Sequence, residues 1–314
     1  MTFLGLDVGG TNCRFEWCPA GDVSGALPGG DARAVQPAVH GVEATVAGLG
    51  EALAVAARTA APTAAVCALA GVGERGLADA LVAGLRTRGV TFPVAVVGDV
   101  LAAAAAALAN GPGLLLWAGT GSFAIARAAD GQLHRIGGRG YLLGDHGSGY
   151  DLVRRAAAAV LAAIDDLGPP TVLTTALTQA FAAPAPQRLG AVLQRLDSGQ
   201  VAAQLPVVLA AAAGGDAVAN AVLGGGVAAL GELAAAAVRR AQLSWRGLPV
   251  AFGGGVLLGV PDYAARLASH LQELGAQVPQ RIEPRAAARG AAWLAHGWHH
   301  RLEPQTSWVQ RVAI

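Results

Sequence analysis

The chain has 314 residues, enough for about two domains, and 54% of them are hydrophobic against 14% charged, so a large core can form. The formal net charge of +1 argues against a partner held mainly by electrostatics, such as nucleic acid or an anionic membrane. All 22 basic residues are arginine. Without lysine the chain has neither a P-loop nor Schiff-base chemistry, because both need a lysine amine.

The three cysteines are too few and too irregularly spaced for a disulfide framework or a zinc site, and they indicate a reducing cytoplasm. Asp7 interrupts the N-terminal apolar segment, so we expect no signal peptide. The segment nearest to a membrane span is Ala217 to Val238. It contains Asn220, the run Gly224-Gly225-Gly226 and Glu232, and its apolar residues are mostly alanine, so we expect a buried helix pair there instead.

The first predicted unit is a glycine-rich hairpin, LGLDVGGTNCR, from Leu4 to Arg14. A short apolar strand ends at Asp7, the backbone turns through glycines, and Arg14 to Trp17 alternate as a second strand. Glycine lets backbone N–H groups approach a ligand closely. An acid beside such a turn suits a metal–phosphate site, although an ordinary tight turn explains the pattern equally well.

The rest of the first half alternates strands with helices, which indicates a largely parallel sheet covered on both faces. We expect a loop over Gly21 to Val39 and a domain boundary near Asn110 to Gly113. The predicted strands are Ala64 to Ala70 and Val94 to Val97, and the predicted helices are Val42 to Arg58, Glu74 to Arg88 and Val100 to Ala109.

At Leu114 the opening pattern begins again, as a strand, the turn AGTGS and a second strand that ends at Arg127. Two strand–glycine/hydroxyl–strand units indicate a weak internal duplication, and together the turns could clamp a polyphosphate. The remaining predicted elements are strands at Leu133 to Ile136 and Leu248 to Phe252, and helices at Tyr150 to Ile164, most of Thr171 to Ala241, Tyr263 to Leu274 and Arg285 to His300.

Two carboxylates are candidates for chemistry. Asp99 follows a predicted strand, where open α/β sheets bind ligands, and could act as a general base. The alternative is a simple helix N-cap. Asp145 lies in GGRGYLLGDHGSG, Gly137 to Gly149, and could bind ligand hydroxyls, or cap the following helix together with Ser148.

Together these segments resemble the actin-like sugar kinases of the hexokinase–actin–Hsp70 superfamily. The most similar branch contains the N-acetylglucosamine kinases, which are related to the ATPases that activate benzoyl-CoA reductases and 2-hydroxyacyl-CoA dehydratases. Its first phosphate motif is similar to LGLDVGGTNCR, its second to LLLWAGTGSFAIAR, and its adenosine motif to VAFGGGVL. The catalytic-Asp segment is matched by GDVLAAAAAAL, and the usual GGWGYLLGDEGSAY by GGRGYLLGDHGSGYDL.

The resemblance implies an α/β fold of two actin-like, ribonuclease H-like domains, residues 1–111 and 112–297, with a nucleotide and sugar cleft. Residues from about 298 to 314 would return to the first domain. It further implies a cytoplasmic homodimer that uses ATP and Mg²⁺ to phosphorylate an amino sugar, with the 6-OH of N-acetylglucosamine or glucosamine as first choice. Asp99 would be the base, and Asp7 would hold the magnesium through water.

The remaining roles are carried over from the same motifs. The ATP phosphates would contact Gly9, Gly10, Thr11, Asn12, Gly119, Thr120 and Gly121. The adenosine would lie against Gly253, Gly254 and Gly255. The sugar would contact Asp99, Asp145, Gly71, Gly138 and Thr120.

The chain departs from the branch at Gly98, which replaces Asn, at Arg139, which replaces Trp, and at His146, which replaces Glu. These departures leave the sugar open. Two other functions stay open: an ATPase that activates a partner reductase or dehydratase, as in the related ATPases, and a sugar- or nucleotide-sensing module without turnover, which only the departures support. The intact carboxylates argue against a sensor, and the placement of the cysteines argues against a cluster-bearing activator.

Overall fold

The computed structural model describes residues 1–8, 13–19, 29–32, 37–69, 72, 76–108, 111–282 and 285–301. Contacts between residues divide the chain into two compact units. Among the described residues, unit 1 comprises those of 1–108 and 282–301, and unit 2 comprises Gly111–Arg281. Each unit is built around one five-stranded sheet.

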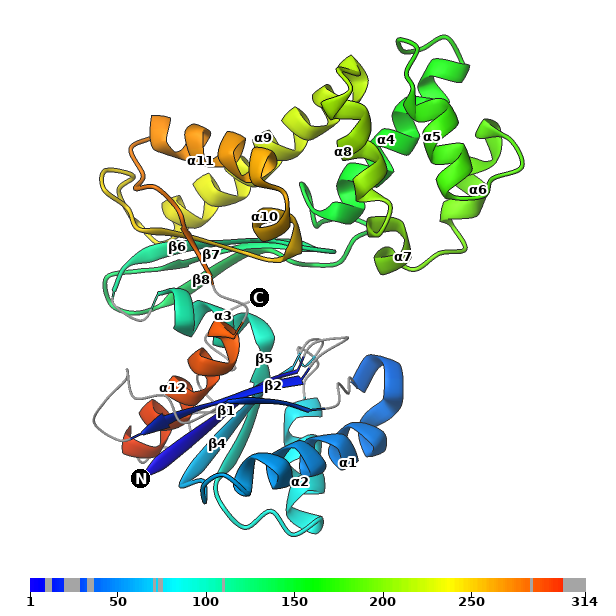
Figure 1. Ribbon diagram of the computed structural model, residues 1–314. Helices are drawn as coiled ribbons and strands as arrows, with labels where there is room; N and C mark the ends of the chain where they lie inside the picture. Colours follow the sequence, from blue (N-terminus) through cyan, green and yellow to red (C-terminus); the bar gives the residue numbers. More distant parts are fainter. Residues whose placement is uncertain are drawn as a thin grey trace. The chain divides into compact units, whose positions relative to one another are not determined.

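The sheet of unit 1 has the strand order β3-β2-β1-β4-β5. Figure 1 labels β1, β2, β4 and β5 of this sheet. A hairpin of antiparallel β1 and β2 lies beside β4 and β5, which run parallel to β1. The carboxyl ends of β1, β4 and β5 therefore lie at one edge. The strands are β1 Thr2–Val8, β2 Cys13–Pro19, β3 Gly30–Ala32, β4 Ala64–Leu69 and β5 Val94–Gly98.

Alternate residues of β1 face different helices, as expected for a strand buried on both faces. Leu4, Leu6 and Val8 belong to a core cluster shared with α1, Pro37–Ala57, and α2, Leu77–Thr87. On the opposite face, a Cβ added at Gly5 would overlap the backbone of α12, Ala286–Arg301. The sheet thus lies between two helical layers, as the alternating pattern predicts.

Helix α12 returns to unit 1 from the far end of the chain and packs beside α3, Asp99–Ala107 (Figure 1). The two helices approach closely, because a Cβ at Gly290 would overlap the Ala102 carbonyl. The rings of His296 and His299 contact Phe3 of β1, with ring centroids 4.9 and 5.5 Å away. The segment that returns to unit 1 starts at Ile282 rather than near residue 298, and these two histidines pack on the sheet.

The sheet of unit 2 has the order β10-β9-β6-β7-β8, which repeats the arrangement of unit 1. Antiparallel β6 and β7 form the hairpin, and β9 and β10 run parallel to β6. The internal duplication predicted from the two glycine–hydroxyl turns is therefore present in the topology. The strands are β6 Gly113–Ala118, β7 Ser122–Arg127, β8 Leu133–Gly137, β9 Val250–Gly253 and β10 Gln280–Arg281.

Helices dominate the remainder of unit 2. Between β8 and β9 lie α4 Gly149–Ile164, α5 Leu173–Ala180, the 3-10 turn η1 Pro186–Arg188, α6 Leu189–Leu193, α7 Ser198–Ala202, α8 Leu205–Ala213 and α9 Ala217–Arg240. After β9 follow α10 Gly255–Gly259 and α11 Pro261–Glu273. The short elements β3, β10 and α10 are absent from the sequence-based prediction, because two to five residues carry little periodicity.

Helix α9 is one continuous helix where a buried pair was expected, so that prediction is wrong. Its three consecutive glycines do not interrupt it, and Gly226 allows close packing: a Cβ there would lie 2.5 Å from Leu152 Cδ2. Among the described residues, α9 is the one helix that passes a length and hydropathy test for a membrane span. It packs against β7, β8, α4 and α11 as the central helix of unit 2.

Candidate functional site

In unit 1, two carboxylates lie at the edge formed by the carboxyl ends of the parallel strands. Asp7 is the penultimate residue of β1 and has the same strand parity as Gly5, so it belongs to the face covered by α3 and α12. Asp99 follows β5 directly and is the first residue of α3. The N-cap is Gly98, so Asp99 is not the helix cap that the simpler alternative supposed. One Asp99 oxygen accepts a hydrogen bond from the Val100 N–H at 2.8 Å.

The charge of Asp99 affects the pKa of Asp7. Burial, with a further contribution from the charge of Asp99, raises the pKa of Asp7 from 3.8 to about 6, although Arg14 opposes the shift. A half-buried carboxylate beside a second acid is poorly stabilised as an anion until a cation neutralises it. Magnesium uses one or two carboxylates together with substrate phosphates, so the donors present fit that ion.

Several predicted contacts lie outside the described residues. These are the phosphate contacts of the first hairpin, Gly9, Gly10, Thr11 and Asn12, and one sugar contact, Gly71, which comes after β4 in the sequence. In unit 1 the site is therefore built here from Asp7 and Asp99.

In unit 2, the turn of Gly119 to Ser122 joins β6 to β7 and has donors available for a ligand. The Gly119 N–H donates to the Gly121 carbonyl at 2.9 Å, and the Ser122 N–H donates to Asp145 Oδ1 at 3.3 Å. Within the described part of the chain, the N–H groups of Thr120 and Gly121 and the exposed Thr120 hydroxyl donate to no protein acceptor. These three groups are the ones that can face phosphate oxygens.

The predicted adenosine turn lies directly beside this phosphate turn. Gly254 has a φ of +87°, and a Cβ there would lie 2.4 Å from the Ala118 carbonyl oxygen, so glycine is required. A Cβ on Gly119 would lie 3.5 Å from the Gly255 nitrogen. The phosphate turn and the adenosine turn, more than 130 positions apart in sequence, thus bring their backbone atoms together in one surface. Gly255 is exposed on that surface.

On its other side the phosphate turn contacts the loop that carries Asp145. A Cβ added at Gly121 would lie 2.8 Å from Asp145 Oδ2. Burial raises the pKa of Asp145, while the Ser122 N–H and the Arg135 guanidinium oppose the shift. Asp145 does not cap α4; Ser148 does, by accepting the Asp151 N–H at 3.2 Å. The Asp145 carboxylate is therefore directed at the phosphate turn.

The other predicted sugar contact, Gly138, begins this loop with a φ of +66°. Its carbonyl accepts a hydrogen bond from Arg135 at 2.7 Å, and the Arg135 guanidinium lies 5.4 Å from the centre of the Phe123 ring. Arg139 and His146, two of the departures from the family pattern, are both exposed. The loop that carries the acid expected to bind the sugar thus also exposes the Arg139 guanidinium and the His146 imidazole.

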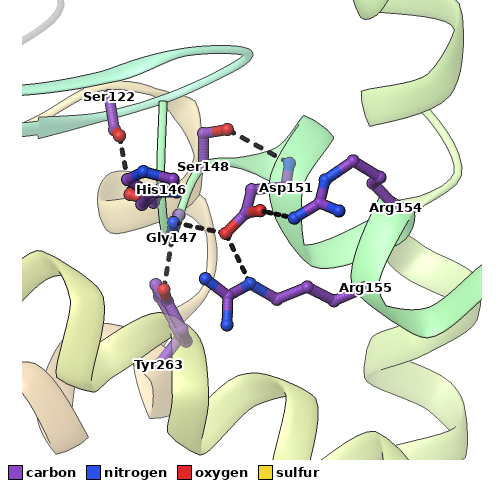
Figure 2. A network of polar contacts seen from close by, with 8 residues as sticks. All are labelled: Ser122, His146, Gly147, Ser148, Asp151, Arg154, Arg155 and Tyr263. Carbon is purple, nitrogen blue, oxygen red and sulfur yellow. Dashed lines mark hydrogen bonds and ion pairs between the residues drawn. The ribbon is translucent and has the colours of Figure 1, made fainter. Parts of the chain in front are cut away.

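A polar network beneath the loop was not singled out from the sequence. Figure 2 shows Asp151 of α4 accepting from the Gly147 N–H and pairing with Arg154 and Arg155, while Tyr263 of α11 bonds Gly147. Part of this network could have been predicted from local spacing. Ser148 and Asp151 have the spacing of a capping box, and Asp151 lies three residues before Arg154 and four before Arg155. Tyr263 carried no such signal, because it lies 116 residues from its partner.

Comparison with known proteins agrees with this geometry. Residues 4–295 match the model of the BadF/BadG/BcrA/BcrD ATPase family. The chain belongs to this family. The match covers both units, and it confirms the resemblance and the α/β fold with two actin-like domains that the motifs implied.

Three similar proteins illustrate the range of similarity. The N-acetylmuramic acid/N-acetylglucosamine kinase of Clostridium acetobutylicum is 41% identical over 61 residues, which are 19% of this chain and 20% of the relative. The N-acetyl-D-glucosamine kinase of Dictyostelium discoideum is 32% identical over 147 residues, 46% of each chain. A Chromobacterium violaceum structure provisionally assigned as an N-acetylglucosamine kinase is 27% identical, with a TM-score of 0.69 over 93% of this chain and 98% of that one. The matches to the two curated relatives thus span less than half of their lengths.

Proposed function

We propose that this member of the BadF/BadG/BcrA/BcrD family transfers a phosphoryl group from ATP to a hydroxyl of an amino sugar. The first candidates are the 6-OH of N-acetylglucosamine and of glucosamine. The observation that carries the proposal is the arrangement in unit 2, where one turn with available donors contacts both a glycine turn and the Asp145 loop. The names of the relatives support an amino sugar as the acceptor.

The carboxylates of unit 1 would supply the acid–base and metal functions. Asp99 would accept the proton of the attacking sugar hydroxyl, as a carboxylate base does in other phosphoryl transfers. Asp7 would hold Mg²⁺ through water, and the ion, when bound, would neutralise charge on the phosphates. Gly9, Gly10, Thr11 and Asn12 would add phosphate contacts from the first hairpin.

The groups of unit 2 would hold the two substrates. Thr120 and Gly121, next to Gly119, would donate to phosphate oxygens, and Gly253 to Gly255 would lie against adenosine. Asp145 would accept hydrogen bonds from sugar hydroxyls, with Gly71, Gly138 and Thr120 near the same substrate. Such a site works by positioning and by charge neutralisation, because phosphoryl transfer asks little covalent chemistry of the protein.

The alternative of a cluster-bearing activator ATPase is disfavoured by the cysteines. Cys13, Cys18 and Cys67 are all buried in strands of unit 1. Burial raises the pKa of Cys13 to about 12 and raises that of Cys67 as well. A thiolate is the form that binds metal, so these thiols are poor ligands. We also infer a cytoplasmic homodimer, on the family resemblance alone.

A panel of sugars in an ADP-release assay tests the proposed function. We expect N-acetylglucosamine or glucosamine to stimulate ADP release well above the sugar-free rate, with glucose as the comparison that lacks nitrogen. N-acetylmuramic acid belongs in the panel because one relative is named for it. If every sugar leaves the ADP-release rate at the sugar-free level, the kinase function is wrong.

A further inference from the structure

Most backbone polar groups in the loop of Asp145 to Gly149 are hydrogen-bonded. The His146 carbonyl accepts from Ser122 Oγ at 2.7 Å, and the Gly147 N–H donates to Asp151 Oδ2 at 2.9 Å. The Gly147 carbonyl accepts from the Tyr263 hydroxyl at 2.9 Å. The Ser148 N–H donates to the Asp145 carbonyl at 3.2 Å, and the Gly149 N–H to the Gly119 carbonyl at 2.8 Å. These bonds restrict the conformation of the loop.

Two buried side chains, those of Asp151 and Tyr263, bind the N–H and the carbonyl of Gly147, as Figure 2 shows. Asp151 and Tyr263 are each only 1% exposed. Although burial alone would raise it, the pKa of Asp151 is lowered by the Gly147 N–H and by Arg154 and Arg155, each 2.7 Å away. Burial, followed by the charge of Asp151, raises the pKa of Tyr263, so its hydroxyl stays protonated and donates.

The fit around Gly147 leaves no room for adjustment. A Cβ there would lie 2.6 Å from both the Gly226 carbonyl oxygen and Leu230 Cγ of α9. The Tyr263 hydroxyl approaches Gly226 so closely that a Cβ added there would lie 2.6 Å from the hydroxyl oxygen. The two glycines let α9, α11 and the loop meet around one hydroxyl group.

This packing determines the backbone conformation of Asp145. Its backbone has a φ of +56°, a left-handed conformation that a non-glycine residue keeps only when its surroundings impose it. One carboxylate oxygen is used by the Ser122 N–H, and the other is directed at Gly121 of the phosphate turn. The direction of that second oxygen therefore follows from the conformation of the loop.

We propose that Asp151 and Tyr263 are positioning residues for the sugar site: by holding the two peptide groups of Gly147, they fix the carboxylate of Asp145 for a sugar hydroxyl. The inference rests on the proposed function, in which Asp145 binds the sugar. Neither side chain needs to touch a substrate. Their effect passes through the backbone of residues 145 to 149, and a positioned acceptor binds a hydroxyl better than a mobile one.

Tyr263→Phe tests this inference with little change in packing. The variant loses one hydrogen bond to Gly147, and we expect the KM for the sugar to rise about 3- to 10-fold, the factor that corresponds to one net hydrogen bond. The KM for ATP should change less than about twofold, because the adenosine turn and the internal bond of the phosphate turn are untouched. Steady-state kinetics with each substrate varied in turn gives both values.

Asp151 provides a graded series. Asn at this position keeps an oxygen that can accept the Gly147 N–H, whereas Ala keeps none. The KM for the sugar should therefore rise in the order wild type, Asp151→Asn, Asp151→Ala. Amide hydrogen exchange at residues 146 to 149 should accelerate in the same order, because the loop opens more often.

Thr45→Val is the matched control. Thr45 is fully buried in unit 1 and donates one hydrogen bond to the Gly41 carbonyl at 2.8 Å. It should lower the melting temperature as Tyr263→Phe does, but leave the KM for the sugar unchanged. If folded Tyr263→Phe and Asp151→Asn both keep the sugar KM of the wild type, the positioning role is wrong while the kinase function stands. A wild-type protein without sugar-stimulated turnover would refute the kinase function, and the positioning role with it.

Discussion

Asp99→Asn is expected to lower kcat for sugar phosphorylation by roughly 10²–10⁴-fold, the usual contribution of a positioned general base. Asparagine is nearly isosteric and keeps an oxygen that can accept the Val100 N–H, so the start of α3 should persist. It cannot accept the proton of the sugar hydroxyl. The KM for ATP should stay within about twofold, since the loss affects the transition state. Steady-state kinetics with purified variant and wild type measures both constants.

The matched control is Asp79→Asn, which neutralises an exposed acid in the first turn of α2 in the same unit. It should leave kcat unchanged. An Asp99→Asn variant that turns over at the wild-type rate would remove Asp99 from the mechanism. A parallel loss of ATP affinity would assign it a binding role instead of a base.

Asp7→Asn is expected to stabilise the nucleotide-free protein while abolishing its turnover. The folded protein holds Asp7 with a pKa of about 6 against the ordinary 3.8, so the ionised form is disfavoured on folding. At pH 7 the difference corresponds to about 3 kcal/mol of lost stability, which the uncharged amide avoids. The same amide removes the charge that would hold magnesium, so phosphoryl transfer should be lost. Urea unfolding without nucleotide measures the first effect, and ADP release the second.

The stability difference between Asp7→Asn and the wild type should also depend on pH. Between about pH 4 and pH 6 the folded state binds more protons at Asp7 than the unfolded state does, so the contribution of Asp7 to stability falls as pH rises. The advantage of Asp7→Asn should therefore be near its full value at pH 7 and about half of it at pH 5. If Asp7→Asn and the wild type are equally stable at pH 7, or if their difference in stability does not vary with pH, the raised pKa of Asp7 is wrong.

The sequence predicts most of the regular structure because the signals are local. Strands β1, β4, β5 and β6 are largely apolar runs with a glycine at, or within two residues of, the carboxyl end, and α4 follows a serine cap. The duplicated sheets follow from the repeated glycine–hydroxyl turn. The placement of Asp7, Asp99 and Asp145 at the ends of strands or beside a turn could be inferred from the same features.

The sequence does not predict the contacts that depend on distant partners. Helix α12 packs beside α3 because Gly290 and Ala102 allow close approach, and nothing in either segment alone indicates the other. The bond from Tyr263 to Gly147 likewise depends on how α9 and α11 pack. Helix α9 was expected to be interrupted because glycine has a low helix propensity, but packing of Gly226 against Leu152 outweighs that preference.

The most direct test of the proposed chemistry is the identity of the product. After incubation of the protein with Mg²⁺, ATP and N-acetylglucosamine or glucosamine, ³¹P and ¹³C NMR should show a sugar 6-phosphate formed in equal amount with ADP. The C6 signal should be displaced and split by coupling to phosphorus. Release of ADP with inorganic phosphate alone would show an ATPase that does not phosphorylate the sugar, and would contradict the kinase function.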